Sequence, residues 1–129
     1  MIHSFKVLTT LSAYRCVSAD TSAHTVVYPA GATSFILGIT KDTVKDTTGA
    51  IPVAGPGEKA LLYFNDTAAA GDMVGSDTSG RGKKFTIAAD TTTSLTLSGA
   101  YVGVLVGAAV AQTATIAEVY IVPGIAKGV

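Results

Sequence analysis

The chain has 129 residues, and its nine basic and nine acidic side chains cancel to a formal net charge of zero. A neutral chain has no large field to attract nucleic acid or an anionic membrane, so neither is expected as a partner. The length is that of one domain. Only 14% of the residues are charged, against about a quarter in ordinary soluble domains. Such a poorly charged surface is expected to be covered by partner subunits.

The N-terminal segment, residues 1–12, mixes apolar side chains with histidine, lysine, serine and threonine. This pattern at a chain end is typical of an edge strand or of an arm that lies on another subunit. We expect an arm, followed by a single domain over residues 13–129. The arm residues expected to dock on a neighbouring subunit are Ile2, Phe5, Val7 and Leu8. No apolar run of signal-peptide length is present here, so no secretion signal is expected.

Short strand-like segments follow, separated by turn signals about every ten residues. The expected strands are residues 14–18, 24–28, 34–40, 50–54, 58–64 and 83–89. Pro29 and the turn at residues 55–57 interrupt the series, because proline cannot continue a central ladder. This spacing predicts an all-β fold, a small single-domain β-barrel or sandwich with short glycine-rich turns, rather than a βαβ fold.

Residues 65–82 are the longest stretch of low hydrophobicity and contain four glycines. Glycine admits positive φ, so sharp reversals of the chain are easiest here. Long loops on a rigid scaffold often carry binding. We therefore expect this stretch to lie at an inter-subunit contact, with Asp72 and Arg81 as contact residues.

Residues 98–124 are expected to form two long strands joined by a short polar connection. Side chains in a strand alternate faces, so Val102, Val104 and Val106 share one face of the first strand. Alanine and glycine stand where a one-sided strand would carry charge, and both faces are therefore expected to be largely covered. The glycines also fit a close-packing motif of membrane helices, but the apolar run is shorter than the ~20 residues that cross a bilayer.

No motif predicts catalysis, a cofactor or a metal. The run at residues 80–84 hints at a phosphate-binding loop, but Asp77 stands where that motif needs glycine and Lys84 where it needs serine or threonine. Cys16 has no evident base and no disulfide partner, which favours a buried thiol and a reducing compartment. Asp66, Asp72 and Asp77 could bind calcium in principle. Their spacing does not match an EF-hand, and such aspartates usually cap their own turns.

The order of elements from residue 14 to residue 123 resembles the capsid decoration, or head cement, proteins of tailed bacteriophages. The segments that carry the resemblance are SFILGIT (34–40), GPGEKALLYF (55–64), AAAGDMVGSD (68–77) and the closing YVGVLVGAAV and ATIAEVYIV strands (101–110 and 114–122). Residues 1–12 and 41–49 have no clear counterpart.

The resemblance implies a non-enzymatic virion protein, made in the bacterial host cytoplasm. It implies binding to the outer face of the expanded capsid, at junctions between subunits of the major capsid protein. Such proteins often act as homotrimers, and they stabilise the head against the internal pressure of packaged DNA. A second contact made by an already held molecule is effectively intramolecular, so modest affinity at each contact would suffice.

Two other functions remain open. One is a carbohydrate- or host-surface-binding β-module of a phage tail or spike. Such sites usually display exposed aromatic side chains, and the chain has five tyrosines and no tryptophan. The other is a carrier domain of the lipoyl type. That function needs a lysine at a hairpin tip, whereas Lys83 and Lys84 begin an expected strand.

Overall fold

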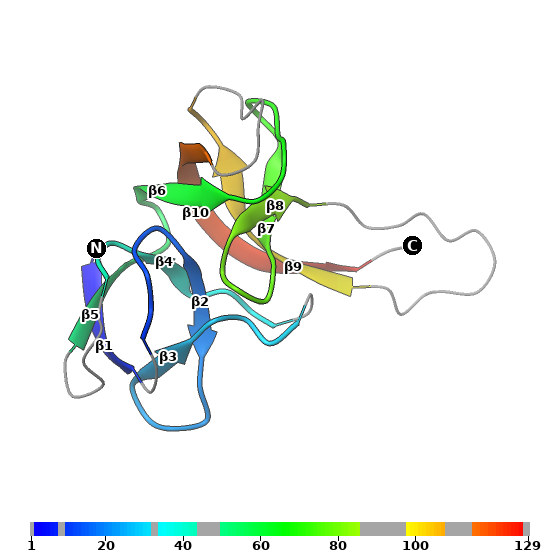
Figure 1. The fold of residues 1–129 in the computed structure, drawn as a ribbon. Coiled ribbons are helices and arrows are strands. Elements are labelled where there is room, and N and C mark those ends of the chain that lie inside the picture. Colours follow the sequence, from blue (N-terminus) through cyan, green and yellow to red (C-terminus); the bar gives the residue numbers. More distant parts are fainter. Residues whose placement is uncertain are drawn as a thin grey trace.

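The structure is a computed structural model, which describes residues 2–7, 10–31, 34–43, 50–85, 98–107 and 115–127. Within those ranges the chain forms ten β-strands and no helix (Figure 1). The strands are β1 (Ile2–Val7), β2 (Cys16–Ala19), β3 (Thr25–Val27), β4 (Gly38–Thr40), β5 (Ala50–Ala54), β6 (Lys59–Phe64), β7 (Met73–Ser76), β8 (Gly82–Lys84), β9 (Ser98–Leu105) and β10 (Thr115–Lys127). The prediction of an all-β fold is confirmed.

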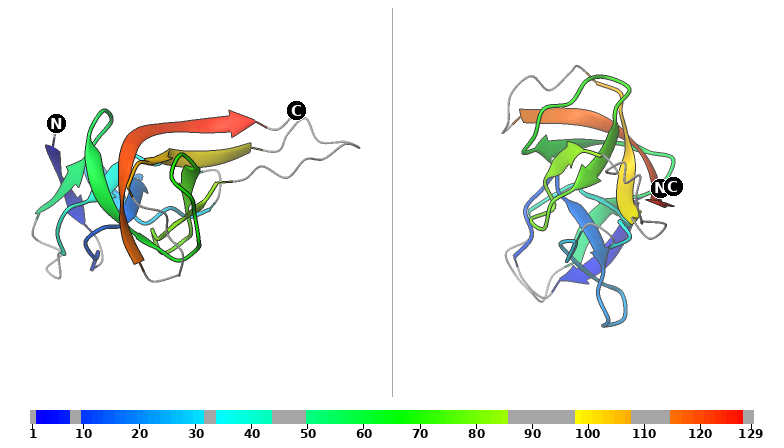
Figure 2. Two further views of the ribbon diagram at one scale, coloured as in Figure 1. Left: turned by 90° about the horizontal axis from the view of Figure 1, so that it is seen from above. Right: turned by 90° about the vertical axis from the view of Figure 1, so that its right-hand side faces the viewer.

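The strands close into two five-stranded barrels that follow one another along the chain. Strands β1 to β5 form the first barrel in the order β1-β3-β2-β4-β5, and strands β6 to β10 form the second in the order β10-β6-β8-β7-β9. The turn at residues 55–58 connects the two barrels, which lie side by side (Figures 1 and 2). The chain thus forms two small barrels where one barrel or sandwich was expected. The number of barrels was not predictable, because closure depends on pairings between distant residues that no local pattern contains.

Strand β1 corrects the prediction of an N-terminal arm over residues 1–12. It pairs antiparallel with β5 from Ile2 opposite Ala54 to Lys6 opposite Ala50, and it pairs parallel with β3. These two pairings close the first barrel. The segment is therefore part of a barrel wall, since its backbone groups are used within the chain rather than offered to another subunit.

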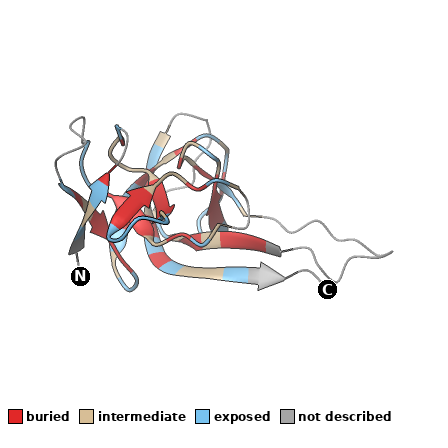
Figure 3. Cartoon of the chain, turned by 90° about the horizontal axis from the view of Figure 1, so that it is seen from below, coloured by how far each residue is buried: buried red, intermediate tan, exposed pale blue. Residues whose placement is uncertain are grey.

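Buried residues lie on strands of both barrels (Figure 3). Their side chains form two hydrophobic clusters. One lies within the first barrel and consists of Val7, Leu11, Val17, Val26, Ile51 and Val53. The larger cluster crosses from one barrel to the other, since Cys16, Ile36 and Ile39 of the first barrel belong to it with Leu62 and Phe64 of the second. The barrels share a core and pack as one unit.

Hydrogen bonds reinforce this junction. The backbone N–H of Tyr63 donates to the carbonyl oxygen of Tyr14, at 2.8 Å. The guanidinium of Arg15 lies 4.8 Å from the centre of the Tyr63 ring, a cation–π distance, and donates to the carbonyl oxygen of Ser79 at 3.2 Å. The segment before β2 is thereby fixed against β6 and against the turn between β7 and β8.

Cys16 lies inside the junction as a free, fully buried thiol. Burial raises its pKa from 9.0 to about 12, with a smaller opposing effect of a hydrogen bond to Ser76. Burial raises the pKa because the charged thiolate loses its hydration when it leaves water, whereas the neutral thiol loses little. The thiol is therefore a packing group, as the sequence predicts.

Strands β9 and β10 form a long antiparallel ribbon, in agreement with the prediction for residues 98–124. Their pairing runs from Leu105 opposite Val119 to Ser98 opposite Lys127, with a register shift between Ile121 and Gly124. The ribbon begins in the wall of the second barrel and continues beyond it (Figures 1 and 2).

Candidate functional site

The outer face of β10 exposes large apolar side chains. Along this strand Ala117, Val119 and Ile121 point into the barrel and are buried. Side chains alternate in a strand, so the residues between them point outward. Ile116, Tyr120 and Val122 are 39 to 44% exposed. The prediction that both faces of this segment are largely covered therefore fails for the chain on its own.

The neighbouring strands extend this apolar surface. Leu61 of β6 lies opposite Glu118 of β10 and is exposed. Val106, the residue that follows β9, is also exposed, and its N–H donates to the carbonyl oxygen of Glu118 at 3.0 Å. We call the surface formed by Leu61, Val106, Ile116, Tyr120 and Val122 the β10 face.

One ion pair interrupts the β10 face. The Nζ atom of Lys59 lies 3.9 Å from Oε1 of Glu118, and both side chains are substantially exposed. Such a pair contributes little to stability. Contiguous exposed apolar patches on soluble proteins commonly mark protein–protein contact sites. The β10 face is thus the strongest docking candidate among the described residues.

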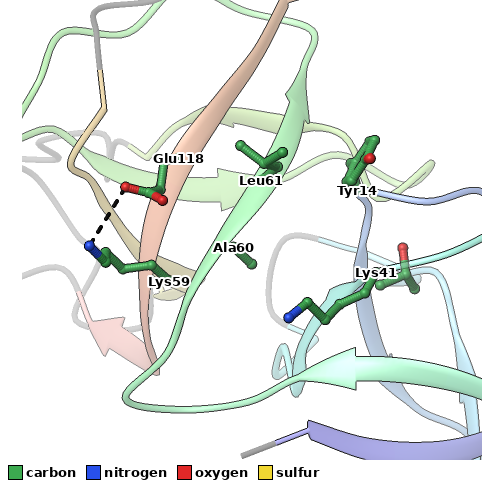
Figure 4. A pocket seen from close by; sticks show the side chains of 7 residues that line it. Tyr14, Lys41, Lys59, Ala60, Leu61 and Glu118 are labelled. Carbon is green, nitrogen blue, oxygen red and sulfur yellow. Dashed lines mark ion pairs between the residues drawn. The ribbon is translucent and has the colours of Figure 1, made fainter.

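A hollow of about 320 Å³ lies between the two barrels (Figure 4). Its lining residues are Tyr14, Thr40 and Lys41 from the first barrel and Lys59, Ala60, Leu61 and Glu118 from the second. Tyr14 has the unusual φ of 63°. Its N–H donates to the carbonyl oxygen of Thr40 at 2.8 Å, and its own carbonyl accepts from Tyr63. Hydrogen bonds on both sides hold this strained wall residue in place.

The residues predicted to dock from an arm lie in the first barrel instead. Val7 is buried in the first core, and Phe5 is half-buried against it. Ile2 pairs with Ala54 in the barrel wall. Leu8 lies outside the described residues. Phe5 and Val7 therefore face the core of the first barrel. The exposed Ser4 and Lys6 alternate with them, which explains the mixed pattern of this part of the segment.

Asp72 and Arg81 are both engaged within the chain and are not brought together. Asp72 precedes β7, accepts a hydrogen bond from the N–H of Ala69 at 2.8 Å, and lies 3.8 Å from Nζ of Lys84. Arg81 follows the turn after β7, and its Nε donates to Oδ2 of Asp77 at 2.8 Å. Residues 65–82 do not form one long loop, because β7 lies within them. A contact of this stretch with another subunit stays a prediction.

The aspartates of this stretch cap turns. Asp66 accepts from the N–H of Thr67 at 2.8 Å, and Asp77 accepts from the N–H groups of Ser79 and Arg81. Across the described ranges no group of three His, Cys, Asp or Glu side chains has a metal-binding arrangement. In the described part of the chain no helix has the length and apolar character needed to cross a membrane.

The fold defines the chain as an all-β protein built from two packed five-stranded barrels. It is similar to a solved structure described as the crystal structure of the head fiber gp8.5 N base in bacteriophage phi29. The TM-score is 0.65, and the match covers 95% of this chain and 93% of that chain at 12% sequence identity. At this identity the likeness shows the fold. No protein-family model matches the sequence, and a search of curated proteins finds no significant match.

Proposed function

We propose that this chain is a non-enzymatic structural protein of a phage virion. It binds the outer surface of the expanded head at junctions between subunits of the major capsid protein and stabilises the head against the pressure of packaged DNA. The fold likeness to a phage head fiber base, over nearly the full length of both chains, supports a virion role. The resemblance of the sequence to head cement proteins supports the finer assignment.

The β10 face is the observation that carries this proposal. Several large apolar side chains lie together on one side of a sheet, with one weak ion pair among them. Burying the exposed half of one such side chain would contribute roughly 1 kcal/mol. Several of them together would offset part of the cost of association. A protein that contacts more than one capsid subunit would need no more than this at each contact.

Copies of the chain are proposed to associate as homotrimers on the head. The low charge of the surface supports this, since neutral copies placed side by side do not repel one another. Beyond the second barrel, no other described strand pairs with the β9–β10 ribbon. Contacts between copies are proposed at its edges, because an unpaired strand edge is a template for further pairing.

Co-sedimentation with expanded heads that lack the protein tests the proposal. The expected result is saturable binding at a fixed ratio to the major capsid protein. A folded protein that stays in the supernatant at all concentrations would contradict the proposal. Glycan binding by that protein would then favour a carbohydrate- or host-surface-binding module.

A further inference from the structure

Strand β6 has one open edge. On one side it pairs with β10 over six residues, from Lys59 to Phe64. On the other side, within the described part of the chain, the ladder is limited to Phe64 opposite Gly82 of β8. On this second side the N–H of Tyr63 donates to Tyr14, and the N–H of Asn65 donates to Gly82. Edges of this kind accept added strands unless they are protected.

The register places the backbone groups of Leu61 on the open edge. In an antiparallel ladder, alternate residues direct both their N–H and C=O groups to the same side. Tyr63 directs its N–H away from β10, so Leu61, two residues earlier, does the same. Among the described residues, none pairs with Leu61 on that side.

This open edge borders the hollow between the barrels. Tyr14 and Lys41 lie across the hollow from β6, on the side away from β10 (Figure 4). The opposite wall is rigid, because Tyr14 is held by hydrogen bonds to Thr40 and Tyr63. A segment that enters the hollow would thus meet a preformed site, which lowers the entropic cost of binding.

The charges around the hollow favour an acidic occupant. Lys41 and Lys59 contribute two positive charges and Glu118 one negative charge, so the lining carries a net charge of +1. Glu118 is 3.9 Å from Lys59. Lys41 is exposed and takes part in none of the salt bridges of the described residues, although its positive charge also helps to lower the pKa of Glu58. A carboxylate entering the hollow would lie beside Lys41 and share its field with Glu58.

We infer that the hollow is a strand-addition site for an extended segment of the major capsid protein that carries an acidic side chain. Backbone groups of the segment pair with Leu61, and its carboxylate lies beside Lys41. Strand addition of this kind takes its affinity from main-chain hydrogen bonds and its specificity from side-chain pockets. The inference rests on the proposed function, since it names the part of the head that this site would bind.

Charge reversal tests the electrostatic part of the inference. Lys41→Glu is expected to weaken binding to expanded heads about tenfold or more, because it replaces an attraction by a repulsion. Lys83→Glu is the matched control, since Lys83 is an exposed lysine on β8 that does not line the hollow. Equal affinity of the two variants would overturn the inference.

Removal of one N–H group tests the strand-addition part. Leu61→Pro deletes the backbone N–H of residue 61, which has no partner among the described residues. Strands tolerate proline where the N–H points away from the ladder. Leu61→Ala keeps the donor and shortens the side chain. The proline variant is expected to bind heads several-fold more weakly than the alanine variant. If the proline variant does not fold, hydrogen exchange of the Leu61 amide is measured instead, in the free wild-type protein and in wild-type protein bound to heads. Exchange is expected to be slower in the bound protein, and equal rates would contradict strand addition.

Peptides separate failure of this inference from failure of the proposed function. Twelve-residue peptides that tile the major capsid protein are titrated into labelled wild-type protein and into Lys41→Glu. An acidic peptide that binds only the wild type supports the inference. Head binding that neither Lys41→Glu nor Leu61→Pro weakens overturns the inference alone. Absence of both head and peptide binding overturns both. A Lys41-dependent self-association without a peptide effect would identify a second copy as the occupant and would also overturn it.

Discussion

The backbone N–H of Cys16 donates a hydrogen bond to the carbonyl oxygen of Gly80, at 2.7 Å. This bond joins the start of β2 in the first barrel to the turn between β7 and β8 in the second. Gly80 has a φ of 76°, and a Cβ atom there would lie 2.6 Å from the carbonyl oxygen of Cys16 and 2.8 Å from the Tyr28 ring. The junction therefore requires glycine at this position.

Gly80→Ala is expected to lower the free energy of unfolding by about 2 to 4 kcal/mol, because it combines backbone strain with backbone overlap. Gly57→Ala is the matched control. Gly57 has a φ of 86°, but nothing lies within 4 Å of its Cβ position, so only the conformational cost of about 1 kcal/mol applies. Chemical denaturation measures both values. Equal losses would show that contact with the first barrel is not the cause.

The Cys16 thiol is expected to resist modification in the native protein. Its pKa is raised to about 12, so almost no thiolate forms at pH 8, and the side chain is fully buried. Ellman's reagent should react with it only after unfolding. Fast reaction at pH 8 in a protein that remains folded would mean that the junction opens readily.

The same pKa shift gives a pH dependence. The unfolded thiol titrates near 9.0 and the folded thiol near 12. The stability associated with the protonated thiol is therefore complete below pH 9 and declines as pH rises toward 12. Lysines and tyrosines titrate in this range as well, so the measurement compares wild type with Cys16→Ala. The variant is expected to lose less stability between pH 9 and pH 11, and parallel curves would contradict the assignment.

Deletion of residues 1–12 is expected to unfold the first barrel, because β1 supplies two of its five pairings and buries Val7. Circular dichroism and denaturation of the shortened chain measure this. Ser4→Ala, at an exposed position of β1, should leave the unfolding transition unchanged. A shortened chain with the wild-type transition would show that the segment is dispensable, as an arm would be.

The double substitution Ile116→Ser and Val122→Ser is expected to weaken head binding by roughly thirtyfold, since each exposed half-side-chain is worth about 1 kcal/mol when buried. Unfolding should change little, because both side chains point outward. Phe35→Ser is the control, at a similarly exposed phenylalanine that precedes β4 and lies off the β10 face. If all three changes leave occupancy intact, the β10 face is not the docking surface.

Local alternation made much of the strand content predictable. Residues 50–54 and 58–64 correspond to β5 and β6, and the valine-rich segment after residue 98 corresponds to β9. Strand β7 was not predictable, because Gly75 lowers β-propensity. In the structure β7 pairs antiparallel with both β8 and β9, and these pairings include Val74 and Gly75. Pairing with strands on both sides favours a strand that local propensity does not.

The two barrels and the hollow between them could not be predicted from local patterns. Tyr14, Lys41 and Lys59 come from separate segments, and barrel closure alone brings them together. The outward side chains of β10 were visible in the alternation of residues 115–122. Their exposure was not, because alanine and glycine within residues 98–124 suggest that both faces are covered, and the single chain does not supply that cover.

A cryo-electron microscopy reconstruction of expanded heads, with and without added protein, is the most direct test of capsid binding. Added density is expected on the outer surface, over junctions between capsid subunits, with the β10 face turned toward the shell. Heads with added protein that show no new outer density, although the protein is folded and in excess, would contradict it.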